Sequence, residues 1–163
     1  MKSILILTTL ILIFSGCSHK NAFSNFEMTQ KQELSASSLQ NSKVKVGERV
    51  DGIFSAIYLN EVYPESFNQN EYFYIFYYLK ENEKLEKPSS LNEAKLKLKL
   101  NGSLPIKVRE LERENQFSNL IEVQNKWTQY YLVSFAKQDN NLSLVFENGQ
   151  SSSDVLIYQK DEQ

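Results

Sequence analysis

The sequence predicts an all-β domain, an antiparallel β-sandwich of seven to eight strands, placed after a signal peptide and a polar tether. Three observations predict it: apolar residues that alternate with polar ones, an excess of aromatic residues, and turn residues at short intervals. The chain has 163 residues with nine tyrosines and ten phenylalanines, but only five glycines and three prolines. Aromatic residues favour strands, and turn signals spaced in this way are typical of a sandwich.

The first seventeen residues, MKSILILTTLILIFSGC, have the layout of a bacterial secretion signal. Lys2 provides a positive charge, and the apolar run from Ile4 to Phe14 is shorter than the roughly 20 residues that span a bilayer. Phe14-Ser15-Gly16-Cys17 resembles a lipobox, the motif at which bacterial lipoproteins are cleaved and lipidated, although leucine usually stands at its first position. This resemblance implies that residues 1–16 are removed and that Cys17 becomes a lipidated first residue. The alternative is an ordinary signal peptide with a chance cysteine.

The lipidated N-terminus and a flexible tether are predicted for residues 17–43, and the β-sandwich domain for residues 44–160. The tether is rich in Ser, Asn, Gln and Lys and lacks a sustained period, although a short helix around Met28 to Leu39 is an alternative for part of it. Ser18 stands where many Gram-negative inner-membrane lipoproteins have aspartate. The sequence therefore predicts the outer membrane, with the lipid anchor holding the protein to it.

The reactive side chains exclude several classes of enzyme. His19, the only histidine, stands two residues after Cys17, the only cysteine. We therefore expect no histidine-based acid–base catalysis, no catalytic triad, no thiol catalysis and no Cys/His zinc site. The chain also lacks a glycine-rich phosphate loop and a basic stripe, and its formal net charge is −2. The sequence predicts a non-enzymatic protein with no catalytic residue, metal, cofactor or nucleic-acid partner.

The predicted strands follow the apolar alternation. Glu71 to Lys80 is apolar on both faces, which predicts a central strand covered on both sides, or a strand with one aromatic surface. The remaining strands are predicted at residues 44–50, 53–59, 95–100, 104–108, 128–137, 142–147 and 154–159. The charged segment 109–119 predicts a loop or a short helical turn.

A hairpin is predicted where Asn101-Gly102 joins two alternating segments. A two-residue loop would place their apolar residues on opposite faces, whereas a three-residue loop, Asn101–Ser103, places them on one face. The three-residue loop is therefore predicted. It would pair Leu100 with Leu104, Leu98 with Ile106, and Leu96 with Val108.

The stretch AIYLNEVYPESFNQNEYFYIFYYLKE, together with NKWTQYYLVSF, resembles small bacterial surface lipoproteins with an immunoglobulin-like sandwich. The likeness covers residues 50 to 160. The chain departs from antibody-type domains in lacking an inter-sheet cysteine pair, and Trp127 precedes a late strand rather than an early one. A variant immunoglobulin-like topology is therefore expected. The resemblance implies display on the cell envelope and contact with a host or another partner, and it brings no catalytic residue.

Five tyrosines are candidates for an exposed partner-binding face, because tyrosine combines a large rigid ring with a hydroxyl. They are Tyr72, Tyr74, Tyr78, Tyr130 and Tyr131. The alternative, which we favour, is that their rings cap the core. For Trp127, a core or edge position is likewise favoured over an anchor in a binding pocket.

Two charged patterns and one modification motif complete the candidates. Lys95, Lys97 and Lys99 form a basic row that suits either an anionic partner or a solvated edge strand. The glutamates at 110, 112 and 114 predict a solvated segment. Asp139-Asn140-Asn141-Leu142-Ser143 resembles the extended acceptor of bacterial oligosaccharyltransferases, which implies glycosylation at Asn141.

Two functions remain open on the sequence alone. The leading hypothesis is a surface-displayed, non-enzymatic lipoprotein that binds a protein or glycan partner, with adhesion as its candidate role. The alternative is a periplasm-facing accessory subunit that stabilises a cell-envelope complex. The same anchor and domain would serve both.

Overall fold

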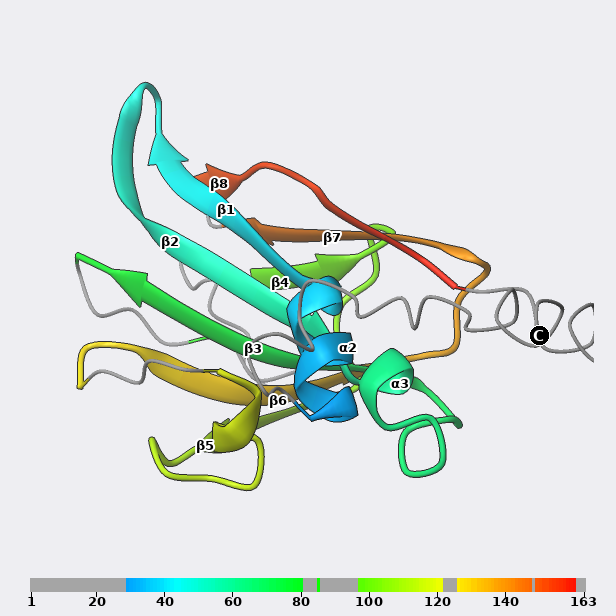
Figure 1. Ribbon diagram of the computed structural model, residues 1–163. Coiled ribbons are helices and arrows are strands. Elements are labelled where there is room, and N and C mark those ends of the chain that lie inside the picture. The colour runs from blue at the N-terminus through cyan, green and yellow to red at the C-terminus, as the bar shows by residue number, and fades with distance from the viewer. Residues whose placement is uncertain (1–28, 81–84, 86–96, 122–125, 148, 161–163) are drawn as a thin grey trace, which may run out of the picture.

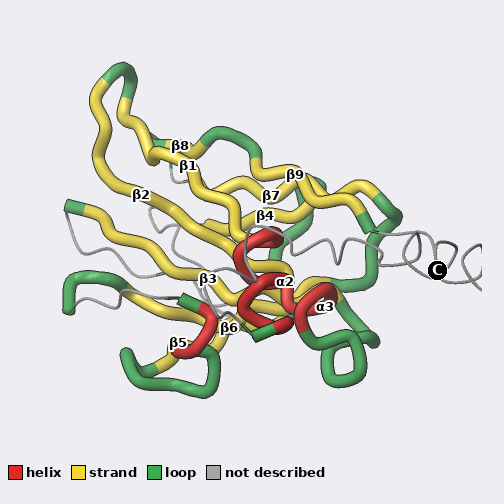
Figure 2. Tube along the Cα trace, in the orientation of Figure 1, coloured by secondary structure: helices red, strands yellow, loops and turns green. Residues whose placement is uncertain are grey.

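The computed structural model describes residues 29–80, 85, 97–121, 126–147 and 149–160, which form a mostly-β domain (Figure 1). In these residues nine strands form one antiparallel sheet, joined by two helices and a 3₁₀ turn (Figure 2). The strands are β1 (Leu39–Val46), β2 (Arg49–Tyr58), β3 (Glu71–Leu79), β4 (Lys97–Leu100), β5 (Lys107–Leu111), β6 (Gln129–Phe135), β7 (Asn141–Glu147), β8 (Ser152–Ser153) and β9 (Leu156–Gln159). The others are α2 (Gln30–Ser38), α3 (Leu59–Val62) and the 3₁₀ turn η3 (Ser118–Leu120).

The sheet is one continuous, curled surface that forms a half-barrel. Its strands follow the order β4-β7-β8-β1-β2-β3-β6-β5, and β9 pairs with β7. The short strand β8 joins the two halves, because Ser153 pairs with Val44 of β1 while Ser152 pairs with Glu147 of β7. The curl turns the inner face of β4, β7 and β9 towards the inner face of β2, β3 and β6.

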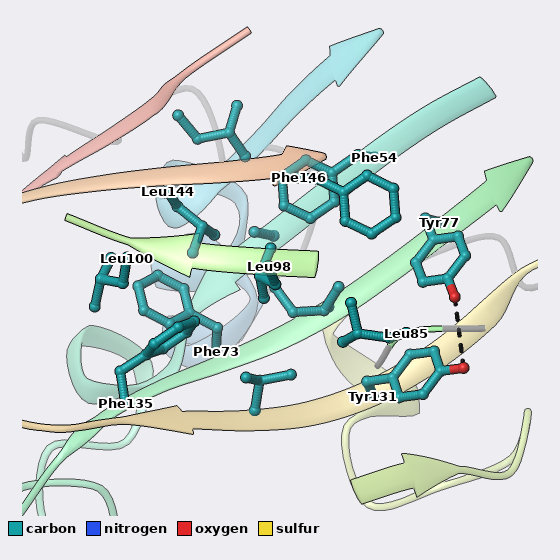
Figure 3. Packing of buried hydrophobic residues seen from close by; sticks show 14 of the residues in the cluster. Phe54, Phe73, Tyr77, Leu85, Leu98, Leu100, Tyr131, Phe135, Leu144 and Phe146 are labelled. Atoms are coloured by element: carbon teal, nitrogen blue, oxygen red, sulfur yellow. Dashed lines mark hydrogen bonds between the residues drawn. The ribbon is translucent and has the colours of Figure 1, made fainter. Parts of the chain in front are cut away.

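The main hydrophobic core fills the inside of the half-barrel (Figure 3). Phe54 of β2 stacks on Phe146 of β7, with ring centroids 4.9 Å apart and ring planes 10° apart. Tyr77 of β3 lies against the same Phe146 ring at 4.9 Å. Leu98 of β4 and Leu85 pack into the same core. Burying a large apolar side chain stabilises a fold by about 1.5–3 kcal/mol, so contacts between the two halves hold the curl in place.

A second apolar cluster lies on the opposite face of β2, β3 and β6, which we call the helix face. Its centre is Tyr74, which is fully buried and whose ring lies 5.2 Å from that of Phe117. Leu34 of α2 and Val62 of α3 pack into the same cluster. Because both faces of β3 carry buried side chains, the prediction of a central strand covered on both sides is confirmed.

The prediction of a sandwich made of two separate sheets is wrong, because β8 connects both halves into a single sheet. The mostly-β, antiparallel character of the domain is confirmed. In a curled sheet and in a sandwich alike, each strand turns one set of alternate residues inward. Apolar alternation therefore predicts both arrangements equally well. The structure is a single sheet because the two serines of β8 pair with β1 on one side and with β7 on the other.

The predicted three-residue loop of the 95–108 hairpin is also wrong. Asn101 and Gly102 alone form the turn, with φ angles of 48° and 80°, and the residues on either side of it, Leu100 and Ser103, bridge to one another. Positive φ at both central positions is typical of the two-residue turn that Asn-Gly favours. The Asn-Gly signal was thus the correct guide to the turn.

Beyond this turn the two strands separate to opposite edges of the sheet. β4 pairs with β7, and β5 pairs with β6. Leu104 and Ile106, which were predicted to face the core, are exposed. The alternation of apolar residues within one segment shows which side chains share a face. It does not show that β4 pairs with β7, and β5 with β6, in place of pairing with each other.

The ordered domain begins earlier than residue 44, within the segment predicted as tether. Residues 30–38 form α2, which confirms the alternative of a short helix in this region, and β1 follows directly. Thr29 caps the helix in a capping box with Gln32. Two of the serines that make this segment look polar are buried: the Ser35 hydroxyl donates to the Leu120 carbonyl at 2.9 Å, and Ser38 bonds the backbone of Tyr58.

Candidate functional site

A buried carboxylate lies at the first residue of β3. Glu71 is 1% exposed, and its Oε1 accepts the Gln138 backbone N–H at 2.9 Å and the Lys160 ammonium at 2.6 Å. Its Oε2 accepts the Tyr58 hydroxyl at 2.5 Å. Burial raises the pKa of the Glu71 carboxyl, but the hydrogen bonds from Gln138, Lys160 and Tyr58 outweigh it, so the pKa lies below its usual value. We call these four residues the Glu71 cluster.

The Glu71 cluster fixes the loop between β6 and β7. The Lys160 ammonium also donates to the Gln138 carbonyl at 2.5 Å, and the Lys160 backbone N–H donates to the Asn140 carbonyl at 3.0 Å. With Gln138 N–H on Glu71, the loop is bonded through its backbone to β3 and to the end of β9. The ion pair between the buried Glu71 and the partly buried Lys160, with its hydrogen bonds to Gln138, holds the backbone of this loop in one conformation.

A shallow polar depression of about 590 Å³, mostly open to solvent, lies beside this loop, and we call it the amide groove. It is lined by Asn101, Asp139, Asn140, Asn141 and Ser143. Asn101 fixes the opposite wall: its Oδ1 accepts the Ser143 N–H at 2.8 Å, and its Nδ2 donates to the Asn141 carbonyl at 3.0 Å. The hydrogen bonds along this wall thus use the backbone of residues 140–143, while the side chains of residues 139–141 are exposed. Carboxylate and amide groups on a fixed backbone can bind a polar ligand through hydrogen bonds.

The predicted glycosylation motif forms part of this groove. Asn141 is exposed at the first position of β7, and its backbone pairs with Gln159 of β9. Asn141 and Ser143 share one face of the strand, because side chains alternate along it. The side chain of Asn141 is accessible, and its glycosylation stays a prediction.

The five candidate tyrosines do not form one exposed face. Tyr131 is buried in the main core, where its ring stacks on a tyrosine of β3 with the ring planes 2° apart. Tyr74 and Tyr130 are buried in the cluster on the helix face, and Tyr72 is half-buried at its margin. The alternative of core packing is confirmed for the three buried rings. Tyr78, at 42% exposure, is the one that the structure presents to solvent.

The remaining candidates that the structure describes lie at the surface. Trp127 is exposed, with the Lys126 ammonium 4.7 Å from its ring centroid, so of the predicted core or edge position the core is excluded. The Lys99 ammonium lies 2.5 Å from the Glu147 carboxylate, and Lys95 lies outside the described residues. The glutamates at 110, 112 and 114 are exposed, as predicted, although β5 takes in the first of them.

Sequence reasoning missed the Glu71 cluster and the role of Asn101. A glutamate at the start of an apolar strand is typical of a strand end that faces water, and its partner Lys160 is 89 residues away in the chain. For Asn101 a signal was present, because Asn-Gly marks the turn that places its side chain. No local pattern shows that this turn meets residues 139–143.

Cys17 and His19 lie outside the described residues. In the ranges that the structure describes, no helix is long and apolar enough to cross a membrane, and no three His, Cys, Asp or Glu side chains gather where they could hold a metal ion. The chain matches no protein-family model, no curated protein and no solved structure. A functional assignment therefore depends on the residues and their geometry.

Proposed function

We propose that the protein is a lipid-anchored, non-enzymatic binding module of the bacterial cell envelope, which is displayed on the outer membrane through Cys17 and binds its partner at the amide groove. The observation that carries this proposal is the exposure of Asp139, Asn140 and Asn141 on a loop fixed by the ion pair of the buried Glu71 with Lys160. A site whose backbone is fixed before binding loses little conformational freedom when the ligand binds. Preorganisation of this kind suits recognition.

The chemistry of the groove favours a glycan or a polar segment of a protein as the partner. Side-chain amides donate and accept hydrogen bonds, and the Asp139 carboxylate accepts them. Sugar hydroxyls and peptide backbones offer the complementary groups. An anchored module with such a groove is suited to adhesion to host cells or matrix.

The anchor is tested by the intact mass of the protein purified from its native host. We expect a chain that starts at Cys17 and carries the added mass of lipid, and a Cys17→Ser variant that keeps its signal peptide and lacks the lipid. A mature chain without lipid would contradict the anchor. The same spectrum shows whether Asn141 carries a sugar, which would occupy the groove itself.

The groove is tested by attachment of cells to host cells or matrix. We expect deletion of the gene to reduce attachment, and the double variant Asp139→Ala/Asn140→Ala to reduce it as far as the deletion does. Glu112→Ala/Glu114→Ala is a matched control, because it also removes exposed polar side chains from a loop. Unchanged attachment by the deletion strain would argue against an adhesive module. A loss with the control pair equal to that with the groove pair would argue against the groove.

A further inference from the structure

Three large apolar side chains are exposed together near the β1–β2 hairpin, and we call them the hairpin patch. They are Val50, Ile53 and Tyr78, with exposed fractions of 40%, 52% and 42%. Ile53 lies opposite Tyr78 across β2 and β3, and Tyr78 is four residues along β3 from the buried Tyr74. Since side chains alternate along a strand, the patch belongs to the helix face.

A bulge in the hairpin adds Val50 to this face. The register of β1 and β2 shifts between Val44 and Lys45, so that Lys45 lies opposite Val50 and one residue of β2 has no partner. Without the shift, the side chain of Val50 would point into the half-barrel, because side chains alternate along β2. The bulge therefore extends the exposed apolar area towards the end of the hairpin.

Lysines lie beside each member of the hairpin patch. Lys43 is directly opposite Ile53, and Lys45 is opposite Val50. The Lys80 ammonium donates to the Val50 carbonyl at 3.3 Å. Lys45 has an exposed partner in Asp154 at 3.7 Å. The result is an apolar centre with a cationic margin, a combination that suits an anionic lipid surface.

The N-terminal chain enters the domain on this same face, at the end of β2 that lies away from the hairpin. α2 packs on the helix face through Leu34, and Thr29, which caps it, is twelve residues after Cys17. A fully extended chain of that length reaches at most about 40 Å. A lipid on Cys17 would thus hold the helix face near the bilayer. The amide groove lies at the β7 side of the curled sheet, where Asn141 and Ser143 turn away from the main core.

We propose that the hairpin patch rests on the anionic lipid surface of the membrane that carries the anchor, and so turns the amide groove away from that membrane. Ile53 and Tyr78 enter the headgroup layer, where tyrosine is favoured because its ring is apolar and its hydroxyl polar. Lys43 and Lys80 lie among the lipid phosphates. This inference rests on the lipid anchor of the proposed function, and it does not depend on which ligand the groove takes.

Lysine footprinting of the lipidated protein tests the proposal. The protein is reconstituted into vesicles of phosphatidylcholine alone or with phosphatidylglycerol, treated with an amine-reactive reagent, and each lysine is quantified by mass spectrometry. We expect Lys43 and Lys80 to react several-fold more slowly on the anionic vesicles than on the neutral ones, with the difference lost at high salt. Lys137, in the β6–β7 loop two residues before Asp139 of the groove, serves as the internal control and should react equally on both.

Two matched variants separate contact with lipid from a general effect. Ile53→Glu should abolish the protection, whereas Ile157→Glu, at an equally exposed position of β9, should leave it intact. Equal reaction of Lys43 and Lys80 on both kinds of vesicle would overturn the proposal, as would protection that is the same in detergent, which indicates a second protein molecule on the patch. Intact mass of the same sample reports the lipid, so loss of the anchor is distinguishable from loss of the contact.

Discussion

The side chains at the two ends of β3 lie in opposite environments, one buried and one exposed. At the first residue, Glu71 is buried and bonded to three partners, and α3 packs nearby. Seven residues later, Tyr78 is exposed beside Ile53. One end therefore buries a charge because its partners are complete, and the other exposes apolar side chains because β2 and β3 extend beyond the helices that cover them. The closed end frames a groove, and the open end offers a surface.

The largest contrast is expected between two tyrosines on the same face of β3. Tyr74→Ala removes a ring that is fully buried against Phe117 and should lower the free energy of unfolding by about 3–5 kcal/mol. Tyr78→Ala should lower it by about 1 kcal/mol or less, because its ring is partly solvated already. Urea denaturation of both variants measures the difference. Similar losses would mean that the open end is covered after all.

The ion pair of the closed end should come next. Lys160→Met leaves the Glu71 carboxylate buried without its cation and should lower the free energy of unfolding by about 3 kcal/mol. Lys99→Met breaks the partly exposed pair with Glu147 and serves as the control, with an expected loss of about 0.5 kcal/mol. The comparison uses chemical denaturation under identical conditions. A negligible loss for Lys160→Met would show that the cluster does not fix the groove loop.

At the open end, the close approach of β2 to β3 depends on Gly52. A Cβ at this position would lie 2.2 Å from the Tyr78 carbonyl oxygen and 2.5 Å from Leu79 Cδ2. Gly52→Ala should therefore lower the free energy of unfolding by about 1–3 kcal/mol. Gly149→Ala, where a Cβ meets nothing within 4 Å, is the matched control and should be close to neutral. Thermal unfolding followed by circular dichroism ranks the two variants.

Acid should lower the free energy of unfolding through the ion pair of the closed end. The pKa of Glu71 is lower in the folded chain than in the unfolded one. Its contribution to stability is therefore complete above the ordinary carboxyl pKa and disappears as the pH falls through the lower folded value. Urea unfolding at a series of acidic pH values should show this loss in the wild-type chain. In Lys160→Met the loss should be smaller, and an unchanged acid dependence would contradict the role of the ion pair.

The strands were largely predictable, because apolar alternation is a local property of the chain. The double-sided run at residues 71–80 identifies β3 as central, and the runs near 95–100, 142–147 and 154–159 correspond to β4, β7 and β9. Strand pairing was not predictable in the same way. Leu104 and Ile106 alternate as core residues do, yet they are exposed because β4 and β5 pair with β7 and β6 and not with each other.

The candidate site shows the same division between local and distant information. The segment from Asp139 to Ser143 was singled out by its own residues, and it lines the amide groove. The other wall, Asn101, and the buried support, Glu71 with Lys160, come from three separate parts of the chain. Charged side chains are ordinarily expected in water, and only the folded structure shows that Glu71 is buried with Lys160 as its partner.

Protease shaving of intact cells tests the proposed display most directly, with a periplasmic protein as the control for an unbroken outer membrane. We predict that the domain is degraded in intact cells while the periplasmic control survives, because an outward-facing binding module must be accessible from outside. Protection until the outer membrane is opened would contradict this display. It would favour instead the accessory subunit of an envelope complex, facing the periplasm.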